Sequence, residues 1–239
     1  MLEINEIFGP TIQGEGKLVG TPSVFIRFGK CNFSCEGFGV EYETPSGIKK
    51  CACDTYYAVD TEFKDTWTKY KSYEEIVNEV DKLISIYPYN YKIDIVITGG
   101  EPLLYWNKEE FQKLLEHYIN AGHKVTIETN ASLNLNINKE YQKELLFSMS
   151  VKLSNSLEPI KKRININTLN TILNNTKESY LKFVIGKDFL NDAKKEINEI
   201  LSLIPKCDVY LMPLGDTAEQ INKNCEDVIN MAIENGFKY

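Results

Sequence analysis

Four of the six cysteines of this chain lie close together in the sequence, at Cys31, Cys35, Cys51 and Cys53. Thiols gathered on one segment form disulfides, bind zinc or hold an iron–sulfur cluster. The spacing Cys31-x-x-x-Cys35 is too wide for the usual first pair of a zinc knuckle, and no second Cys-x-x-Cys pair or His pair follows. Three thiolates on a [4Fe–4S] cluster would leave one iron open for a substrate or cofactor. The segment therefore indicates a metal site and favours an iron–sulfur cluster.

Composition indicates the compartment in which this site works. The net charge of −7 argues against a nucleic-acid binder, because contact with phosphates needs a basic surface. No apolar run approaches the roughly 20 residues of a membrane span, and residues 1–6 lack the pattern of a signal peptide. We therefore expect a cytoplasmic protein without a membrane partner, in which clustered cysteines bind metal. Cys207 and Cys225 are expected to be buried apolar residues.

Apolar, β-branched segments alternate with amphipathic segments along most of the chain, which is typical of α/β proteins. Six strands are expected, at residues 22–28, 93–98, 124–129, 147–153, 180–185 and 208–212. Right-handed crossovers would place them in a parallel sheet, and six strands are too few for a closed eight-stranded barrel. We therefore predict an α/β fold, an open partial (β/α) barrel, in a single domain of residues 1–239. Motifs at the carboxyl ends of its strands would share one rim.

Three segments fall outside this alternation. Residues 9–16 are rich in glycine and are expected to form a loop. Residues 36–52 carry several glycines and a proline between the cysteines, so we expect an insertion in the cysteine loop that forms a hairpin or an irregular excursion. Residues 60–70 are polar and aromatic and receive no assignment.

A second motif, Thr98-Gly99-Gly100-Glu101-Pro102, directly follows one of the expected strands. Taken alone it has two interpretations: an ordinary tight turn from strand to helix, or a site where two glycines let the backbone approach a ligand without a clash at Cβ. Together with the cysteines, it resembles the radical S-adenosylmethionine (SAM) superfamily. In that superfamily Cys-x-x-x-Cys-x-x-Cys holds the cluster, and Gly-Gly-Glu-Pro lies beside the methionine part of SAM.

Further motifs narrow this resemblance. They lie at residues 9–16, 27–35, 53–55, 97–102 and 127–130. In this order they resemble the 7-carboxy-7-deazaguanine synthase family, whose motifs this chain matches from residue 9 to about residue 155. The resemblance implies a homodimeric lyase that converts the small molecule 6-carboxy-5,6,7,8-tetrahydropterin to 7-carboxy-7-deazaguanine with loss of ammonia, in the queuosine pathway. The implied cofactors are a [4Fe–4S] cluster, SAM used catalytically and Mg²⁺, with a reductant such as flavodoxin or ferredoxin.

The chain departs from the family pattern at the cluster. Two residues usually separate the second and third cysteines, whereas residues 36–52 separate Cys35 from Cys53 here. Relatives also carry insertions in this loop, and an Asp-Thr pair follows Cys53 as in the family's Cys-Asp-Thr. The resemblance thus implies three cluster ligands: Cys31, Cys35 and Cys53. An alternative, in which Cys51 replaces Cys35, stays open.

The resemblance also assigns roles to single residues. Arg27 would hold the substrate carboxylate with two hydrogen bonds, rather than form a surface ion pair. Thr55 would offer Mg²⁺ a hydroxyl oxygen, rather than cap a helix. The other implied substrate-binding residues are Ile12, Gln13, Gly14, Glu15 and Thr98. The implied SAM-binding residues are Ala52, Asp54, Gly99, Gly100, Glu101, Glu128, Asn130, Ser150, Lys152 and Ser154.

Several of these side chains have an ordinary alternative role. Gln13 and Glu15 could be solvated turn residues, and Glu128 could be a strand-end charge that faces water. Val151 stands where the family has a proline, so the segment around it matches less well. The family usually continues with a last strand that carries His or Gln, whereas this chain ends at Tyr239. Contacts from the C-terminus to the substrate therefore stay open.

Two other functions stay as alternatives. A radical SAM activase, which generates a glycyl radical on a partner protein, would share the cluster and Gly-Gly-Glu-Pro. It would not require Arg27 or the sequence Gln-Gly-Glu-Gly at residues 13–16. A zinc-stabilised binding module without catalytic activity would share only the cysteines. Colour separates this last function from the others, because protein purified without air is brown with an iron–sulfur cluster and colourless with zinc.

Overall fold

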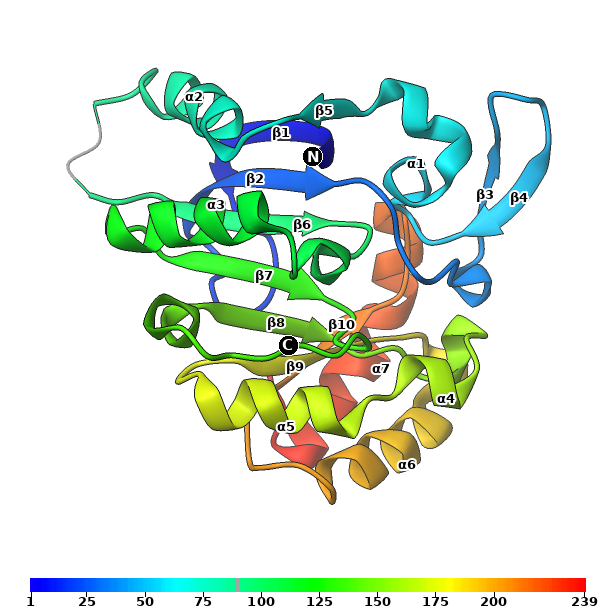
Figure 1. Ribbon diagram of the computed structural model, residues 1–239. Helices are drawn as coiled ribbons and strands as arrows, with labels where there is room; N and C mark the ends of the chain where they lie inside the picture. The colour runs from blue at the N-terminus through cyan, green and yellow to red at the C-terminus, as the bar shows by residue number, and fades with distance from the viewer. Residues whose placement is uncertain (89–90) are drawn as a thin grey trace.

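The computed structural model describes residues 1–88 and 91–239, and its main sheet is mostly parallel. Within these residues, eight strands form one sheet in the order β10-β9-β8-β7-β6-β2-β1-β5 (Figure 1). Six of the described strands run parallel: β2 (Pro22–Phe28), β6 (Asp94–Gly99), β7 (Val125–Thr129), β8 (Leu146–Ser150), β9 (Tyr180–Ile185) and β10 (Val209–Pro213). Two antiparallel strands extend one edge: β1 (Leu2–Ile12) and β5 (Thr68–Tyr70).

The parallel strands are those that the sequence predicts, and the predicted α/β partial barrel is confirmed. They are recognisable because strands covered on both faces consist of nearly continuous apolar sequence. The two antiparallel strands are not predicted. β1 contains Gly9-Pro10, and its pairing with β2 is irregular between Phe8 and Thr11, so its sequence does not alternate regularly. β5 has only three residues, too few to produce a periodic pattern.

Long helices lie between most of the parallel strands along the chain, and one more follows β10. The long ones are α2 (Tyr73–Ile84), α3 (Glu109–Asn120), α5 (Ile166–Asn175), α6 (Leu190–Leu201) and α7 (Ala218–Asn235). In Figure 1, α3 and α5 lie in front of the sheet. Alternate strand residues, such as Ile97 and Phe183, are fully buried in the core that the strands form with the helices. None of the described helices is long and apolar enough to span a membrane.

The insertion in the cysteine loop forms a hairpin, one of the two forms expected. Its strands are β3 (Val40–Glu43) and β4 (Lys49–Ala52), and they pair antiparallel apart from the main sheet. Tyr42 stacks on Tyr56 of the short helix α1 (Tyr56–Val59), with ring centroids 4.2 Å apart. Lys50 forms ion pairs with Asp60 and Glu62 at 2.8 and 2.9 Å. The hairpin is therefore packed against the segment that follows it.

The chain end lies beside the edge strand β10. The amide of Lys238 donates to the carbonyl oxygen of Val209, and the amide of Leu211 donates to the carbonyl oxygen of Lys238, both at 2.8 Å. Cys225 and Cys207 are only half-buried, so the prediction that they are buried is wrong. The Cys225 Sγ lies 2.9 Å from the Tyr239 hydroxyl, because α7 and the chain end meet at this edge.

The loop between β1 and β2 crosses the face of the sheet opposite α3 and α5. In Figure 1 this dark-blue connection passes behind β6 and β7 toward β8. The Gln13 side chain donates to Asp94 of β6 at 2.5 Å, and Glu15 pairs with Lys182 of β9 at the same distance. Farther along the loop, Leu18 packs against side chains of β8, β9 and β10, namely Leu146, Tyr180 and Tyr210. We call residues 13–21 the crossing loop.

Candidate active site

A cavity of about 360 Å³ opens at the carboxyl ends of the parallel strands. Each of these strands contributes a side chain to its lining: Arg27, Thr98, Glu128, Ser150, Lys182 and Met212. Successive side chains of a strand point to opposite faces, so these residues lie on the face opposite the helix-packed core. The crossing loop and the cysteine loop supply further lining residues. The motifs singled out in the sequence therefore lie at one rim.

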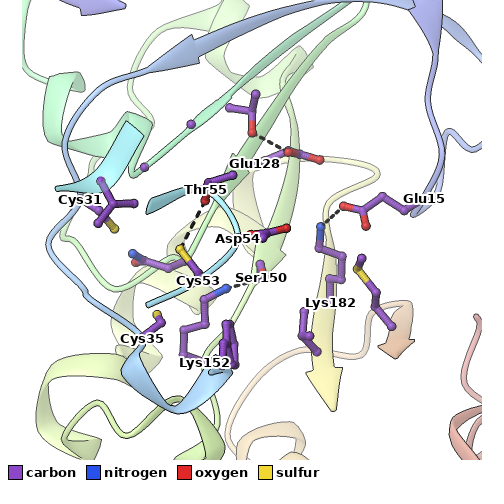
Figure 2. Close-up of a pocket in the computed structure, with 18 of the residues that line it drawn as sticks. Glu15, Cys31, Cys35, Cys53, Asp54, Thr55, Glu128, Ser150, Lys152 and Lys182 are labelled. Atoms are coloured by element: carbon purple, nitrogen blue, oxygen red, sulfur yellow. Dashed lines mark hydrogen bonds and ion pairs between the residues drawn. The ribbon is translucent and has the colours of Figure 1, made fainter. Parts of the chain in front are cut away.

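Three thiols share one side of this cavity. Cys31 and Cys35 follow β2, Cys53 follows β4, and all three line the cavity (Figure 2). The Cys53 Sγ lies 3.3 Å from the Thr55 hydroxyl, which also lines the cavity. Cys51 does not line it, and its Sγ contacts the carbonyl oxygen of Glu36 at 3.3 Å. The geometry thus favours Cys35 over Cys51 as the partner of the other two thiols.

These thiols fit a [4Fe–4S] cluster better than a single ion. Among residues 1–88 and 91–239, no three Cys, His, Asp or Glu side chains are close enough together to hold one metal ion. A cluster makes a different demand, because its thiolate ligands bind different irons around one cavity. Burial raises the pKa of Cys31, with added effects from Glu101, Cys35 and Cys53, and burial raises the pKa of Cys35 to about 12. Metal binding would displace these thiol protons.

The cysteine loop is held by a carboxylate that the sequence did not single out. One oxygen of Glu158 accepts hydrogen bonds from the backbone amides of Ser34 and Cys35, at 2.7 and 3.1 Å. Burial alone would raise the pKa of Glu158, but hydrogen bonds from Lys162 and these amides lower it overall. An ionised Glu158 therefore fixes the loop at Cys35, whose φ of 51° lies in the left-handed region.

The two glycines at the end of β6, Gly99 and Gly100, are required by packing as well as by any approach of a ligand. A Cβ atom on Gly99 would lie 2.1 Å from the carbonyl oxygen of Phe28, and one on Gly100 would lie 2.1 Å from that of Lys30. The Gly99 φ of 129° also disfavours any other residue. The end of β6 thus packs directly against the start of the cysteine loop while it lines the cavity. Close packing therefore accounts for the two glycines, and their role beside a ligand stays a prediction.

Glu101 is fully buried and does not line the cavity. Its carboxylate accepts hydrogen bonds from the amide of Leu103, the hydroxyl of Thr129 and the amide of Asn130, at 2.6 to 2.9 Å. Burial raises its pKa despite these bonds. Glu101 therefore joins the ends of β6 and β7 and orients Asn130, which does line the cavity.

The opposite side of the cavity is lined by charged side chains. Lys182 is buried, and its Nζ lies 2.5 Å from the Glu15 carboxylate (Figure 2). Burial alone would lower the pKa of Lys182, but the charges of Glu15 and Glu128 outweigh burial and raise it. Glu128 also accepts a hydrogen bond from the Thr98 hydroxyl at 2.6 Å. Arg27 donates from Nε to Glu6 at 2.7 Å, which uses one of its five N–H donors.

Most residues implied by the resemblance line this cavity, but four of them do not: Ile12, Ala52, Glu101 and Ser154. Ile12 is exposed, Ala52 is buried, and Ser154 bonds to Glu196. The lining residues that the sequence analysis missed include Phe33, Phe38, Lys182 and residues 212–215. A signal for Lys182 existed, because it is a lysine inside an otherwise apolar strand.

Comparison with known proteins agrees with these features. Residues 51–228 match the radical SAM superfamily. The chain is 30% identical to a 7-carboxy-7-deazaguanine synthase of Rickettsia prowazekii, with 99% of this chain and 84% of the relative aligned. It is 29% identical to a synthase of the same name from Halobacterium salinarum, over 100% of this chain and 87% of the relative. A third such synthase, from Clostridium acetobutylicum, is 31% identical over 85% and 78% of the two chains.

Solved structures show the same fold. QueE from Escherichia coli superposes with a TM-score of 0.64 at 20% identity, over 99% of this chain and 92% of that chain. SuiB of Streptococcus suis bound to S-adenosylmethionine superposes with a TM-score of 0.52 at 15% identity, over 86% and 46%. The superfamily implies a [4Fe–4S] cluster and SAM, which the three thiols and the glycine rim fit. The chain belongs to the 7-carboxy-7-deazaguanine synthase family and is a radical SAM enzyme of the queuosine pathway.

Proposed function

We propose that this enzyme converts 6-carboxy-5,6,7,8-tetrahydropterin to 7-carboxy-7-deazaguanine with loss of ammonia, with Mg²⁺ and with SAM that is regenerated. One observation carries the proposal. The Gln-Gly-Glu segment of residues 13–15, Arg27, the three thiols and the Gly-Gly rim come from distant parts of the chain and line one cavity. These are the motifs in which the chain resembles the family, so they meet where a substrate and a cofactor could react.

Charged and hydrogen-bonding side chains from several elements would bind the substrate. Arg27 would bind the substrate carboxylate with the N–H groups that remain beyond its bond to Glu6. Gln13, Gly14 and Glu15 would contact the polar edge of the pterin, and Thr98 would contact it from β6. The Gln13 side-chain nitrogen already donates to Asp94 and to the Ser23 hydroxyl. We therefore assign its carbonyl oxygen the role of accepting a hydrogen bond from the substrate.

The proposed cofactor side is formed by the cysteine loop and the rim. Cys31, Cys35 and Cys53 would hold the cluster, and Thr55 would give Mg²⁺ a hydroxyl ligand. Gly99, Gly100, Asn130 and the neighbouring polar residues would bind SAM: Asp54, Glu128, Ser150 and Lys152. When bound and reduced by a donor such as flavodoxin or ferredoxin, these cofactors would supply the one-electron chemistry that removes a hydrogen atom from the substrate and returns it. The walls of the cavity would keep water away from the reacting groups.

An anaerobic assay with substrate deuterated at C6 tests the proposal. The reconstituted protein is mixed with SAM, Mg²⁺, a reductant and the deuterated carboxy-tetrahydropterin, and products are identified by mass spectrometry. We expect 7-carboxy-7-deazaguanine, ammonia, and deuterium that enters SAM over many turnovers. A matched sample without Mg²⁺ should turn over more slowly.

Two results would contradict the proposal in different ways. If no deazaguanine forms while SAM is cleaved, the substrate assignment is wrong and an activase gains support. If the product forms but one 5′-deoxyadenosine accumulates per product and no label reaches SAM, the substrate stands and the catalytic use of SAM is wrong.

A further inference from the structure

Lys182 is the residue of this cavity whose role neither the motifs nor the chemistry above explains. Its side chain is 8% exposed, and it lies among the polar residues of the cavity rather than in water. An ammonium group in such a place needs a negative partner, because removing an unpaired charge from water is costly. The crossing loop supplies that partner, Glu15, with Nζ and Oε1 2.5 Å apart. Glu128 adds a second negative charge nearby.

The two partners of this ion pair differ in how firmly the backbone holds them. Lys182 lies in the middle of β9 and is paired with Ser150 of β8 on one side and Tyr210 of β10 on the other. Glu15 lies between Gly14 and Gly16, and glycines give a loop more conformational freedom than other residues do. Lys182 is therefore the fixed partner, and Glu15 is the partner whose position the ion pair determines.

The other contacts of the crossing loop are made by residues on both sides of Glu15, whose own side chain is held by the pair. Gln13 is held at β6 by its bond to Asp94, and Leu18 is held at β8 to β10 by apolar packing. Between these two points, Gly16 contacts Tyr180 so closely that a Cβ atom would lie 2.3 Å from the Tyr180 hydroxyl. Lys17, which also lies between the two anchors, pairs with Asp208 at 3.6 Å. Glu15 is the acidic side chain between them, and Figure 2 shows it directed toward Lys182.

We propose that Lys182 is a positioning residue of the reaction, whose ammonium group holds Glu15, and with it the start of the crossing loop, where the loop contacts the substrate. The inference rests on the proposed function, since it assumes that residues 13–15 bind the pterin. A purely structural Lys182 would stabilise the barrel without affecting substrate affinity. A Lys182 that touches the substrate itself would act independently of Glu15.

A double-mutant cycle separates these roles. The variants are Lys182→Met, Glu15→Gln and the two combined, with Lys182→Arg to retain the charge if Lys182→Met folds poorly. Lys223→Met is the matched control, because Lys223 forms an exposed pair with Glu219 at 2.8 Å on α7, away from the cavity. Each cluster-loaded protein, with SAM and without reductant, is titrated with the carboxy-tetrahydropterin by calorimetry. Amide hydrogen exchange of residues 13–21 is measured on the same samples.

We expect Lys182→Met to raise the Kd of the substrate about tenfold to hundredfold, since small displacements of a binding group weaken its action on this scale. The double variant should bind no more weakly than Glu15→Gln alone, because the lysine acts through Glu15. Lys182→Arg should lie between Lys182→Met and the wild type. Exchange of residues 13–21 should be faster in Lys182→Met and unchanged in Lys223→Met.

Three results would overturn the inference. Unchanged substrate affinity in Lys182→Met or Lys182→Arg, with only a lower melting temperature, would make the lysine structural. Additive effects of the two substitutions would place Lys182 on the substrate itself. Unchanged exchange of the crossing loop would show that the ion pair does not hold it. Failure of the wild type to bind the carboxy-tetrahydropterin would instead contradict the proposed function, so the two failures are distinguishable.

Discussion

Cys51 and Cys53 are two residues apart, yet their thiols lie in different surroundings. Cys51 belongs to β4 of the hairpin and contacts the Glu36 carbonyl, whereas Cys53 follows the end of that strand and reaches the cavity. A strand that continued would place both side chains on one face. The end of the strand at Ala52 is therefore what directs Cys53 toward Cys31 and Cys35.

This difference predicts the outcome of single substitutions. Cys31→Ala, Cys35→Ala and Cys53→Ala should each lose most of the iron after anaerobic reconstitution, because each removes one of three thiolate ligands. Cys51→Ala is the matched control and should retain the iron content and the brown colour of the wild type. Iron content and the visible absorption spectrum provide the measurement. If Cys51→Ala loses the cluster while Cys35→Ala keeps it, the proposed ligand set is wrong.

At the scale of elements, β6 carries a buried carboxylate that connects the sheet to the crossing loop. Asp94 accepts hydrogen bonds from Gln13 and Thr126, but its second oxygen has no hydrogen-bond partner within the described chain. Burial outweighs these bonds and raises the pKa of Asp94 to about 6. The folded protein therefore binds a proton at Asp94 more readily than the unfolded chain does.

Stability should consequently depend on pH through this group. Because the folded protein binds this proton more tightly, protonated Asp94 stabilises the fold. This contribution is fully present below the unfolded pKa of about 4 and is lost as pH rises through the folded pKa of about 6. The loss amounts to about 3 kcal/mol if burial acts in full. We expect Asp94→Asn, which stays neutral, to flatten this part of the curve. Denaturant unfolding of the iron-free protein between pH 4 and 7 measures it, with the exposed Asp65→Asn as control. Parallel curves for Asp94→Asn and the wild type would contradict the assignment.

The parallel strands show what the sequence could predict and why. These strands consist largely of continuous apolar sequence, and polar residues in them line the cavity. Local sequence therefore predicts both the parallel sheet and the edge at which the site lies. The residues that were missed depend on contacts between distant segments. Glu158 reaches the amide of Ser34 across 124 positions, and Lys182 reaches Glu15 across 167. No local period or short motif reports such contacts.

The backbone structure of β1 and of the hairpin also depends on contacts that local sequence does not predict. The sequence predicts a glycine-rich loop at residues 9–16, but β1 continues to Ile12 because β2 is available for pairing there, with Thr11 opposite Ser23 and Ile12 opposite Pro22. The hairpin was one of two expected forms because its glycines and proline permit either. Tertiary contacts, such as the stacking of Tyr42 on Tyr56, accompany the form that is adopted.

For the whole molecule, membership in the family leads us to expect a homodimer. The described sheet has two edges: β5 and β10, the latter extended by the bridge between Tyr210 and Lys238. Sedimentation equilibrium of the reconstituted protein should give twice the mass of the chain at micromolar concentration. Buffers of low and high salt serve as comparison, since an interface held by apolar contact is less sensitive to screening. A single-chain mass in both buffers would contradict the expected dimer.

The crossing loop also determines when the site can exist during the life of the protein. Its residues are among the first to be synthesised, but the strand that carries Lys182 emerges from the ribosome much later, and Tyr210 later still. Contacts between segments so far apart in sequence form slowly, because the chain loses entropy when it closes the long loop between them. A nascent or truncated chain that ends before β9 therefore has its cysteines and glycines and lacks the residue that holds Glu15. The cavity is therefore complete only after β9 and β10 have been synthesised, although most of its motifs lie earlier in the chain.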